Sequence, residues 1–266
     1  PSLVGSEMCI RDRRETIAAL LPLGPEYASV TFGAGGSTRE RTFATVDMIR
    51  KDYDLEAVPH LSCIGSTESG IREILEDYRA QGIQRIVALR GDLPEGMSNP
   101  GHFEYAADLV GFIRQFGGFK IYVAGYPEVH PKAVSAEEDL QHLVEKVQSG
   151  ADAVITQYFY NPDAYLQLRD DLQRRGVEVP IVVGVMPITN FEQISRFSAM
   201  CGAELPQYLR RRMEAYGEDL QSQYQFGIEL LSRQCETLLS QGAPSLHFYT
   251  LNQSEATTAI WQNLGL

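Results

Sequence analysis

Short apolar runs rich in Val, Ile, Tyr and Phe alternate along the chain with amphipathic segments that carry helix-start and helix-end residues. The first six runs recur about every 30 residues, the length of one βα unit. Repeated βα units with apolar strands predict a parallel sheet covered by helices. The predicted strands are Tyr27–Thr31, Ala57–Cys63, Arg85–Leu89, Lys120–Ala124, Ala153–Gln157, Ile181–Val185 and Ser245–Tyr249.

Capping residues mark the predicted helices between these strands. Thr67 precedes an amphipathic face of Ile71, Ile74, Leu75 and Tyr78, and Gly82 ends that segment. Ser135 with Glu138 forms a capping box, and Asn161 stands before Pro162 at the first helical position. Further helices are predicted after Asn190, after Pro206, over 219–240, and from Ser254 through Ile260.

Polar residues stand at the carboxyl ends of nearly all these strands, where a closed barrel would gather them on one face. Seven strands can be counted, and the helix at about residues 14–21 has no strand before it. We therefore predict an α/β fold of (βα)8 TIM-barrel type, incomplete and without its first strand. The strand-end residues are Thr31, His60, Arg90, Asp92, Tyr126, His130, Gln157 and Asn252.

Residues 1–13 show neither strand alternation nor a βα boundary. We expect them to be a non-native segment, such as a cloning or read-assembly scar, with a divergent native start as the alternative. Residues 14–266 are expected to form one domain, because no linker or low-complexity tract interrupts them.

The composition limits the partners. Hydrophobic residues make up 44% and charged residues 22%, which is ordinary for a globular protein. The net charge of −12 argues against nucleic-acid or membrane partners, although a local basic pocket for phosphate is compatible with it. The four cysteines are scattered, which favours reduced thiols in a cytoplasmic protein.

Two strand-end loops carry charged or glycine-rich motifs. SVTFGAGGS contains Gly33 and Gly35, but Thr38 stands where a dinucleotide fingerprint needs a third glycine, so a tight βα turn explains the loop equally well. LRGDLP places the cation of Arg90 and the carboxylate of Asp92 at the mouth of the sheet. They are either ligand contacts or an ion pair that pins the loop.

Three later loops carry uncharged or aromatic candidates. AGYPEVHP holds Tyr126, Glu128 and His130 between two prolines, as a ligand clamp or a rigid turn. ITQYFYN ends on Gln157, whose amide suits either an amide or pterin edge or the neighbouring loop backbone. Phe191 in VMPITNF would stack on a flat ring or pack in the core.

No metal site is expected. His60 and Cys63 are the only close His/Cys pair, and strand alternation points them to opposite faces. A serine nucleophile elbow is also missing from the sequence.

Seven strings in order, SVTFGAGGS, VPHLSCIG, LRGDLP, AGYPEVHP, ITQYFYN, VMPITNF and HFYTLN, resemble bacterial methylenetetrahydrofolate reductase over roughly residues 14–266. The resemblance implies a cytoplasmic FAD-binding barrel, expected to be a homo-oligomer, in one-carbon metabolism and methionine biosynthesis. NADH, or NADPH, would reduce the flavin. The flavin would then reduce 5,10-methylenetetrahydrofolate to 5-methyltetrahydrofolate, with ping-pong kinetics.

The resemblance also implies residue roles. Asp92 resembles a carboxylate near flavin and folate, and Gln157 an amide that contacts nicotinamide and pterin in turn. Phe191 resembles a ring that stacks on either substrate, Gln253 lies at a substrate-contact position, and Lys146 would face the pyrophosphate. The implied FAD-binding residues are Thr31, Phe32, Ala34, His60, Arg90, Gly91, Asp92, Ala106, Tyr126, His130, Ala133, Asp139 and Lys146.

The chain departs from the family pattern in three ways. His142 and Glu145 stand where Asn and Arg are common, and Gln253 replaces an Arg. The family's general-acid glutamate lies in its first strand, and nothing in residues 1–13 matches it; Glu7 has the wrong context. Two alternatives therefore stay open: a flavin oxidoreductase that does not use folate, and a catalytically impaired FAD-binding fragment. Flavin bleaching by NADH separates a reductase from an inert binder.

Overall fold

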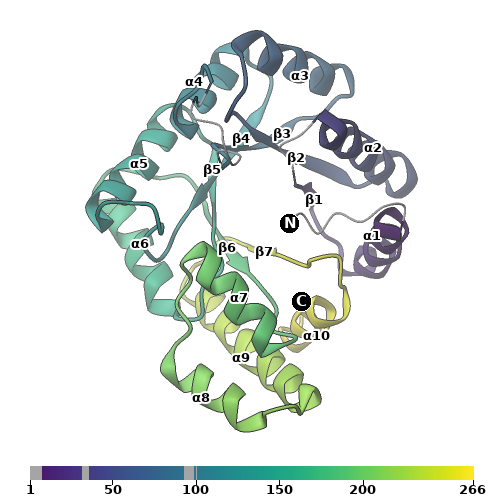
Figure 1. Cartoon of the computed structure of the whole chain (residues 1–266), viewed down its shortest axis with the longest axis vertical. Coiled ribbons are helices and arrows are strands. Elements are labelled where there is room, and N and C mark those ends of the chain that lie inside the picture. Colours follow the sequence, from purple (N-terminus) through teal and green to yellow (C-terminus); the bar gives the residue numbers. More distant parts are fainter. Residues whose placement is uncertain (1–7, 32–35, 93–98, 100) are drawn as a thin grey trace. The chain divides into compact units, whose positions relative to one another are not determined.

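A computed structural model of the chain describes residues 8–31, 36–92, 99 and 101–266 (Figure 1). The described residues form an α/β fold with seven parallel strands in the order β1 to β7, which confirms the predicted incomplete TIM-type barrel. All predicted strand ends agree within one residue. The strands are β1 (Tyr27–Val30), β2 (Glu56–Ser62), β3 (Arg85–Leu89), β4 (Lys120–Gly125), β5 (Ala153–Thr156), β6 (Ile181–Val185) and β7 (Leu246–Phe248).

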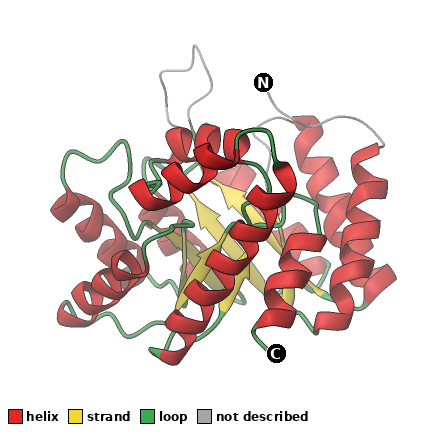
Figure 2. Cartoon of the chain, turned by 90° about the horizontal axis from the view of Figure 1, so that it is seen from below, coloured by secondary structure: helices red, strands yellow, loops and turns green. Residues whose placement is uncertain are grey.

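Helices alternate with the strands along the chain. Figure 2 shows the helices in red and the strands in yellow. Among the residues described, no helix combines the length and apolar composition that crossing a membrane requires. The helices are α1 (Met8–Leu20), the 3-10 helix η1 (Leu21–Leu23), α2 (Gly36–Tyr53), α3 (Glu68–Ala80), α4 (Ala106–Phe116), α5 (Ala136–Gln148), α6 (Pro162–Arg174), α7 (Phe191–Cys201), α8 (Gln207–Tyr216), α9 (Leu220–Ser240) and α10 (Glu255–Asn263).

The predicted helix caps are mostly confirmed. Thr67 Oγ1 accepts a hydrogen bond from the Gly70 N–H at 3.1 Å, and Ser135 Oγ accepts one from the Glu138 N–H at 3.1 Å. Ser254 is an exception, because its side chain makes no capping bond, and α10 continues beyond Ile260. The terminal helix therefore begins where predicted but without the predicted side-chain cap.

The chain divides into two compact units. Unit 1 comprises Pro1–Gly24, Gly125–Leu140 and Ile155–Leu266, and unit 2 comprises Pro25–Ala124 and Gln141–Val154.

Unit 2 is built on β1 to β4, which pair in parallel register (Figure 1). The predicted apolar face of α3 is buried, with Ile71 and Leu75 fully inaccessible. On β2, His60 and Ser62 are half-buried while Leu61 between them is fully buried, as expected when alternate side chains face opposite sides.

Unit 1 contains β6 and β7, which pair with Val185 opposite Phe248. All five residues of β6 are buried. Between these strands, α9 is the longest described helix and contacts α6, α8 and α10. The predicted helical insertion is thus present, and it provides much of the packing in this unit.

Candidate functional site

The predicted site residues fall in both units, and each unit is described in turn. Phe32 and Ala34 lie outside the described residues. Unit 2 holds Thr31, His60, Arg90, Gly91, Asp92, Ala106 and Lys146. Unit 1 holds Tyr126, His130, Ala133, Asp139, Gln157, Phe191 and Gln253.

In unit 2, the backbone after β3 lies directly against the end of β2. Ser62 Oγ donates to the Arg90 carbonyl at 2.9 Å, and the Ile64 N–H donates to the same oxygen at 2.9 Å. Gly91 follows with φ of +83°, a conformation that L side chains rarely adopt. A Cβ on Gly91 would overlap Ser62 Oγ and approach Ile64 Cγ2 to 3.0 Å. Only glycine fits this close approach.

Arg90 is held by the segment that leads into α4. Its Nε donates to the Glu104 carbonyl at 2.9 Å. Asp108 Oδ2 accepts from the N–H groups of Glu104 at 3.1 Å and Tyr105 at 2.8 Å, directly before Ala106 begins the helix. The guanidinium is therefore positioned by a main-chain carbonyl whose own segment is capped onto α4. The Arg90 side chain is thus held by the residue two positions before Ala106.

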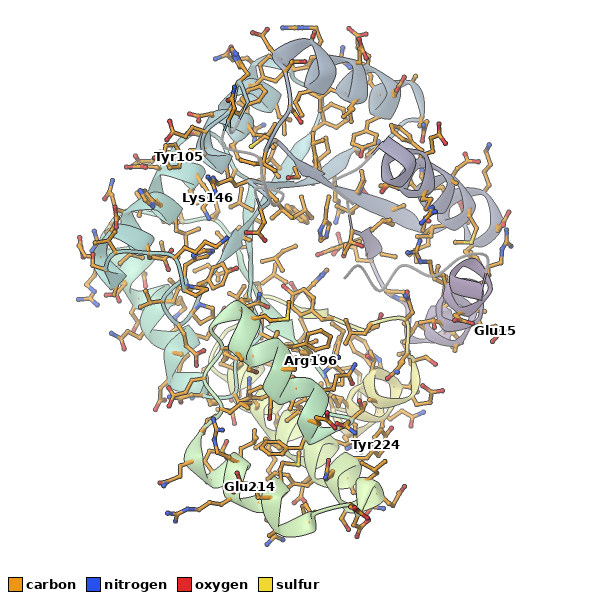
Figure 3. The ribbon with its side chains drawn as sticks, in the orientation of Figure 1. Glu15, Tyr105, Lys146, Arg196, Glu214 and Tyr224 are labelled. Carbon is orange, nitrogen blue, oxygen red and sulfur yellow. The ribbon has the colours of Figure 1, made fainter. Side chains whose placement is uncertain are left out.

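Lys146 stands at the carboxyl end of β4. From α5, its Nζ donates to the Ala124 carbonyl at 2.5 Å (Figure 3). The side chain is half-buried, so a cation is held at a strand end in a chain of net charge −12. On the same helix, the His142 ring lies 5.9 Å from the ring of Tyr105, which is 50% exposed.

Thr31 directly follows β1, and His60 stands on β2. Thr31 is exposed, and its carbonyl accepts from Thr42 Oγ1 at 3.3 Å. His60 is half-buried, whereas Cys63 is fully buried, and burial raises the pKa of the Cys63 thiol to about 11. Among the described residues, no group of three or more His, Cys, Asp or Glu side chains is arranged to hold a metal ion.

In unit 1, the AGYPEVHP loop brings four predicted residues together. The His130 N–H donates to Asp139 Oδ2 at 2.9 Å, and the Ala133 N–H donates to the His130 carbonyl at 2.9 Å. The rings of Tyr126 and His130 meet edge to face with centroids 4.5 Å apart. His130 Nδ1 accepts from the Lys132 N–H at 3.1 Å, so on the neutral ring Nε2 carries the proton.

Glu128 anchors the same loop. Its Oε2 accepts from the Glu204 N–H at 2.7 Å, and burial raises the pKa of this carboxyl above its ordinary value. Within the described residues, its Oε1 is buried without a hydrogen-bond partner. Glu128 therefore serves the loop's attachment to the segment before α8.

Gln157 directly follows β5 and is half-buried. Its N–H donates to the Gly125 carbonyl at 2.7 Å, and its Oε1 accepts from the Tyr158 N–H at 3.0 Å. Across the described part of the chain, no hydrogen bond involves Nε2. The amide oxygen thus serves the loop backbone, as one of the two predictions had it, while the amide N–H groups are left for a ligand acceptor.

Phe191 is the first residue of α7 and is half-buried. Its N–H donates to Gln223 Oε1 at 2.9 Å. The residue lines a pocket of about 580 Å³ together with Met213 and Leu220. Phe191 is therefore neither fully packed in the core nor fully exposed.

Gln253 is exposed in the loop after β7. The two residues that precede it, Leu251 and Asn252, adopt φ of +50° and +60°, which is uncommon for residues other than glycine. Thr16 Oγ1 donates to the Asn252 carbonyl at 2.8 Å and holds this strained turn in place.

Sequence reasoning missed the side chains that hold the loop after β5. Gln234 Nε2 donates to the Phe159 carbonyl at 2.9 Å, and the hydroxyl of Tyr208 donates to the Tyr160 carbonyl at 3.4 Å. Gln234 is 75 residues away from Phe159 in sequence, so no local pattern marks the contact. A glutamine at a buried position of an amphipathic helix was the available signal.

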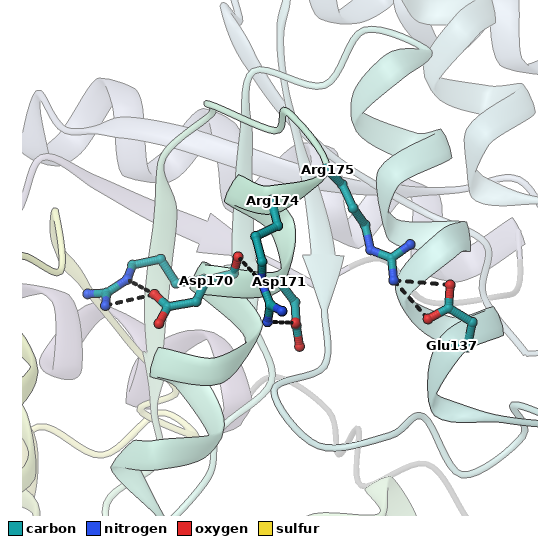
Figure 4. A network of polar contacts seen from close by, with 6 residues as sticks. Glu137, Asp170, Asp171, Arg174 and Arg175 are labelled. Carbon is teal, nitrogen blue, oxygen red and sulfur yellow. Dashed lines mark hydrogen bonds and ion pairs between the residues drawn. The ribbon is translucent and has the colours of Figure 1, made fainter.

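A network of ion pairs in unit 1 joins the carboxyl-terminal end of α6 to the start of α5 (Figure 4). Arg175 pairs with Glu137 at 2.8 Å, and Arg174 pairs with Asp171. Glu137 and Arg174 are mostly exposed, so solvent screens these pairs and each contributes about 1 kcal/mol or less. They form a solvated helix surface rather than a site.

The comparisons with known proteins confirm the family resemblance that the loop motifs indicated. A family model described as methylenetetrahydrofolate reductase matches residues 9–265. The 5,10-methylenetetrahydrofolate reductases of Salmonella typhimurium and Escherichia coli are 40% and 39% identical over 251 residues, covering 94% of this chain and 84% of each relative. An NADH enzyme of that name from Arabidopsis thaliana is 36% identical over 95% of this chain and 45% of its own length.

One solved structure shares the fold at a TM-score of 0.67, with 14% identity, covering all of this chain and 91% of its own. It is a Clostridium thermocellum protein described as binding two copies of 5-methyl-5,6,7,8-tetrahydrofolic acid, and at this identity the likeness concerns the fold alone. The family match spans nearly the whole chain and carries the assignment. The chain belongs to the methylenetetrahydrofolate reductase family.

Proposed function

We propose that this chain reduces 5,10-methylenetetrahydrofolate to 5-methyltetrahydrofolate with FAD as cofactor and NADH or NADPH as electron donor. Family membership supports the reduction of methylenetetrahydrofolate. The observation that carries the cofactor assignment is the pair of cations, Arg90 and Lys146, that main-chain carbonyls hold at strand ends of unit 2.

The donor set of unit 2 fits FAD. Arg90 and Lys146 are cations held by main-chain carbonyls at strand ends, and they suit the anionic pyrophosphate. Thr31, directly after β1, and His60 on β2 add further hydrogen-bonding groups. In unit 1, the interlocked Tyr126 and His130 offer a rigid edge that loses little entropy when a ligand binds.

FAD bound by these residues would supply the hydride chemistry between the pyridine nucleotide and the folate. Asp92 contributes a negative charge after β3 that opposes further negative charge on a neighbouring group. Gln157 contributes amide N–H donors, because its oxygen is bonded to Tyr158. We assign those donors to carbonyl oxygens of nicotinamide and pterin, and the ring of Phe191 to stacking on either substrate.

Use of the same residues by both substrates predicts that they bind in turn, with ping-pong kinetics. A cytoplasmic homo-oligomer in one-carbon metabolism, supplying methyl groups for methionine, completes the proposal. The family match favours methylenetetrahydrofolate reduction over the alternative, a flavin oxidoreductase that does not use folate. The matching relatives named above are reductases of methylenetetrahydrofolate.

The test separates the two half-reactions. Purified chain is supplied with FAD, freed of unbound cofactor and mixed anaerobically with NADH or NADPH while the visible flavin absorbance is followed. We expect bleaching by the nucleotide and recovery of the absorbance on adding 5,10-methylenetetrahydrofolate. Bound flavin that stays oxidised with both nucleotides would refute the reductase proposal. Bleaching without recovery by the folate would favour an oxidoreductase with another acceptor or a chain impaired in the folate step.

A further inference from the structure

The loop that follows β5 is attached to α7 through one buried phenol. Tyr158 is 4% exposed and Ser198 is 3% exposed, and their hydroxyl oxygens are hydrogen-bonded at 3.3 Å. The Cys201 thiol donates to the same Tyr158 oxygen at 3.1 Å. Ser198 and Cys201 stand three residues apart on α7, so both can face the same neighbour. The Tyr158 hydroxyl is therefore bonded to two side chains of one helix.

The Tyr158 hydroxyl and the Tyr158 ring make different contributions to this attachment. Burial raises the pKa of Tyr158 above its ordinary value, so the hydroxyl stays neutral and acts as a hydrogen-bonding group. The ring lies near the rings of Tyr160 and Tyr249, with centroids 5.8 Å and 6.4 Å away. Apolar contacts of this kind bury the ring but are not directional. The hydroxyl adds direction, because hydrogen bonds weaken steeply as their angle departs from linear.

The main chain of Tyr158 orients the amide of Gln157. The Tyr158 N–H donates to Gln157 Oε1 at 3.0 Å, while the Gln157 N–H donates to the Gly125 carbonyl at 2.7 Å. The first of these bonds turns the amide oxygen toward the loop and so directs the amide nitrogen away from the Tyr158 N–H. Tyr158 thus meets α7 with its side chain and Gln157 with its main chain, and a shift of the side chain would move the N–H that holds the amide.

We infer that Tyr158 is a positioning residue: its hydroxyl, held by Ser198 and Cys201 of α7, fixes the loop so that the Tyr158 N–H sets the direction of the Gln157 amide. The inference rests on the proposed function, because it assumes that this amide meets both the pyridine nucleotide and the folate. Tyr158 itself is buried and acts through Gln157. Since one amide serves both substrates, loss of the hydroxyl should weaken the use of both by a similar factor.

The test uses Tyr158→Phe, which removes the hydroxyl and keeps the ring. Tyr165→Phe is the matched control, because Tyr165 is 1% exposed and its hydroxyl donates to the Ile181 carbonyl at 2.8 Å. Ile181 is the first residue of β6, so this bond lies at the amino end of a strand, whereas the candidate site lies at carboxyl ends. The control therefore makes the same chemical change at a buried position away from Gln157.

Two quantities are measured on FAD-loaded protein. One is the rate of flavin bleaching at a limiting concentration of the nucleotide that bleaches the parent faster, and the other is the Kd of 5-methyltetrahydrofolate by calorimetry. For Tyr158→Phe we expect the bleaching rate to fall and the Kd to rise, each by about threefold to tenfold, the range for loss of one hydrogen bond. Tyr165→Phe should lower the melting temperature to a similar extent and leave both quantities unchanged.

A double-mutant cycle with Gln157→Ala separates positioning from general loosening of the loop. In the Gln157→Ala background, Tyr158→Phe should change either quantity by less than about twofold, because the amide through which it acts is gone. Equal changes in both backgrounds, an effect on only one of the two substrates, or a lowered melting temperature with both quantities unchanged would overturn the inference.

The parent chain and Gln157→Ala distinguish failure of the inference from failure of the proposed function. If Gln157→Ala alone changes neither quantity while the parent flavin bleaches and recovers, the inference fails and the reductase proposal stands. A parent flavin that stays oxidised with both nucleotides refutes the proposed function, and the inference fails with it.

Discussion

The close approach of Gly91 to Ser62 makes a quantitative prediction for Gly91→Ala. A φ of +83° costs a residue with a Cβ about 1–2 kcal/mol, and forcing the new methyl against Ser62 Oγ and Ile64 costs about 1–3 kcal/mol more. The free energy of unfolding should therefore fall by about 2–5 kcal/mol. For a chain of this length each kcal/mol lowers Tm by about 2 °C, so thermal unfolding should show a fall of about 4–10 °C.

Gly242→Ala is the matched control. Gly242 has φ of +89°, but a Cβ there would meet no atom within 4 Å. It should incur the backbone cost alone, about 1–2 kcal/mol or a fall in Tm of about 2–4 °C. If the two variants are destabilised equally, contact with Ser62 is not what requires glycine at position 91.

Removing the overlapped atom tests the contact directly. Ser62→Ala deletes the Oγ and its hydrogen bond to the Arg90 carbonyl, which costs about 1 kcal/mol by itself. The steric cost of Gly91→Ala should be smaller once Ser62 Oγ is gone. The double variant should therefore lose about 1 kcal/mol less free energy of unfolding than the sum of the losses of the two single variants. Strict additivity, measured by chemical denaturation, would contradict the steric argument. Gly91→Ala should also retain less flavin than Gly242→Ala after gel filtration.

Three further predictions concern charged and titratable groups. Lys146→Met should weaken FAD binding about tenfold to a hundredfold in a fluorescence titration, the range for a charge-assisted hydrogen bond, whereas Lys120→Met at the exposed start of β4 should not. Burial lowers the pKa of His247 from 6.5 to about 4, so on acidification the unfolded chain binds this proton before the folded chain does. The free energy of unfolding should therefore fall as the pH drops from about 6.5 toward about 4. His247→Gln should make that pH dependence shallower, as urea titrations at several pH values would show. Burial raises the pKa of Cys63 to about 11 and of Cys235 to about 12, so both thiols should resist alkylation at neutral pH until urea unfolds the chain, as mass spectrometry would show.

The elements that could be predicted are those specified by neighbouring residues. Strand alternation placed β3 and β6 at their observed bounds, and the hydroxyl of Thr67 caps α3 as its sequence context indicates. Helix α4 was not marked by a typical cap, because Tyr105 occupies that position and Asp108 supplies the carboxylate from within the helix. The local sequence thus predicts where a helix begins only when a typical capping residue stands at its first position.

The contacts that hold the candidate site were less accessible to sequence reasoning. AGYPEVHP was predicted to be a stiff loop, and the observed hydrogen bond from its His130 N–H goes to Asp139, only nine residues further along the chain. The partner of Phe191, by contrast, lies 32 residues away on a helix whose glutamines resemble ordinary surface residues. Pairings of that kind depend on how helices pack, and periodicity in one segment contains no information about which carbonyl a distant side chain will meet.

The loops beside the candidate site are secured through their main chain. Arg90 meets the carbonyl of Glu104, Gln234 that of Phe159, and Gln223 the N–H of Phe191. Every residue type except proline offers the same N–H and C=O groups, so the attachment does not depend on which side chain the loop displays. Residues of these loops can accordingly be substituted one at a time while the main-chain attachments remain. Substrate preference can therefore change, in evolution or by engineering, without a change of fold.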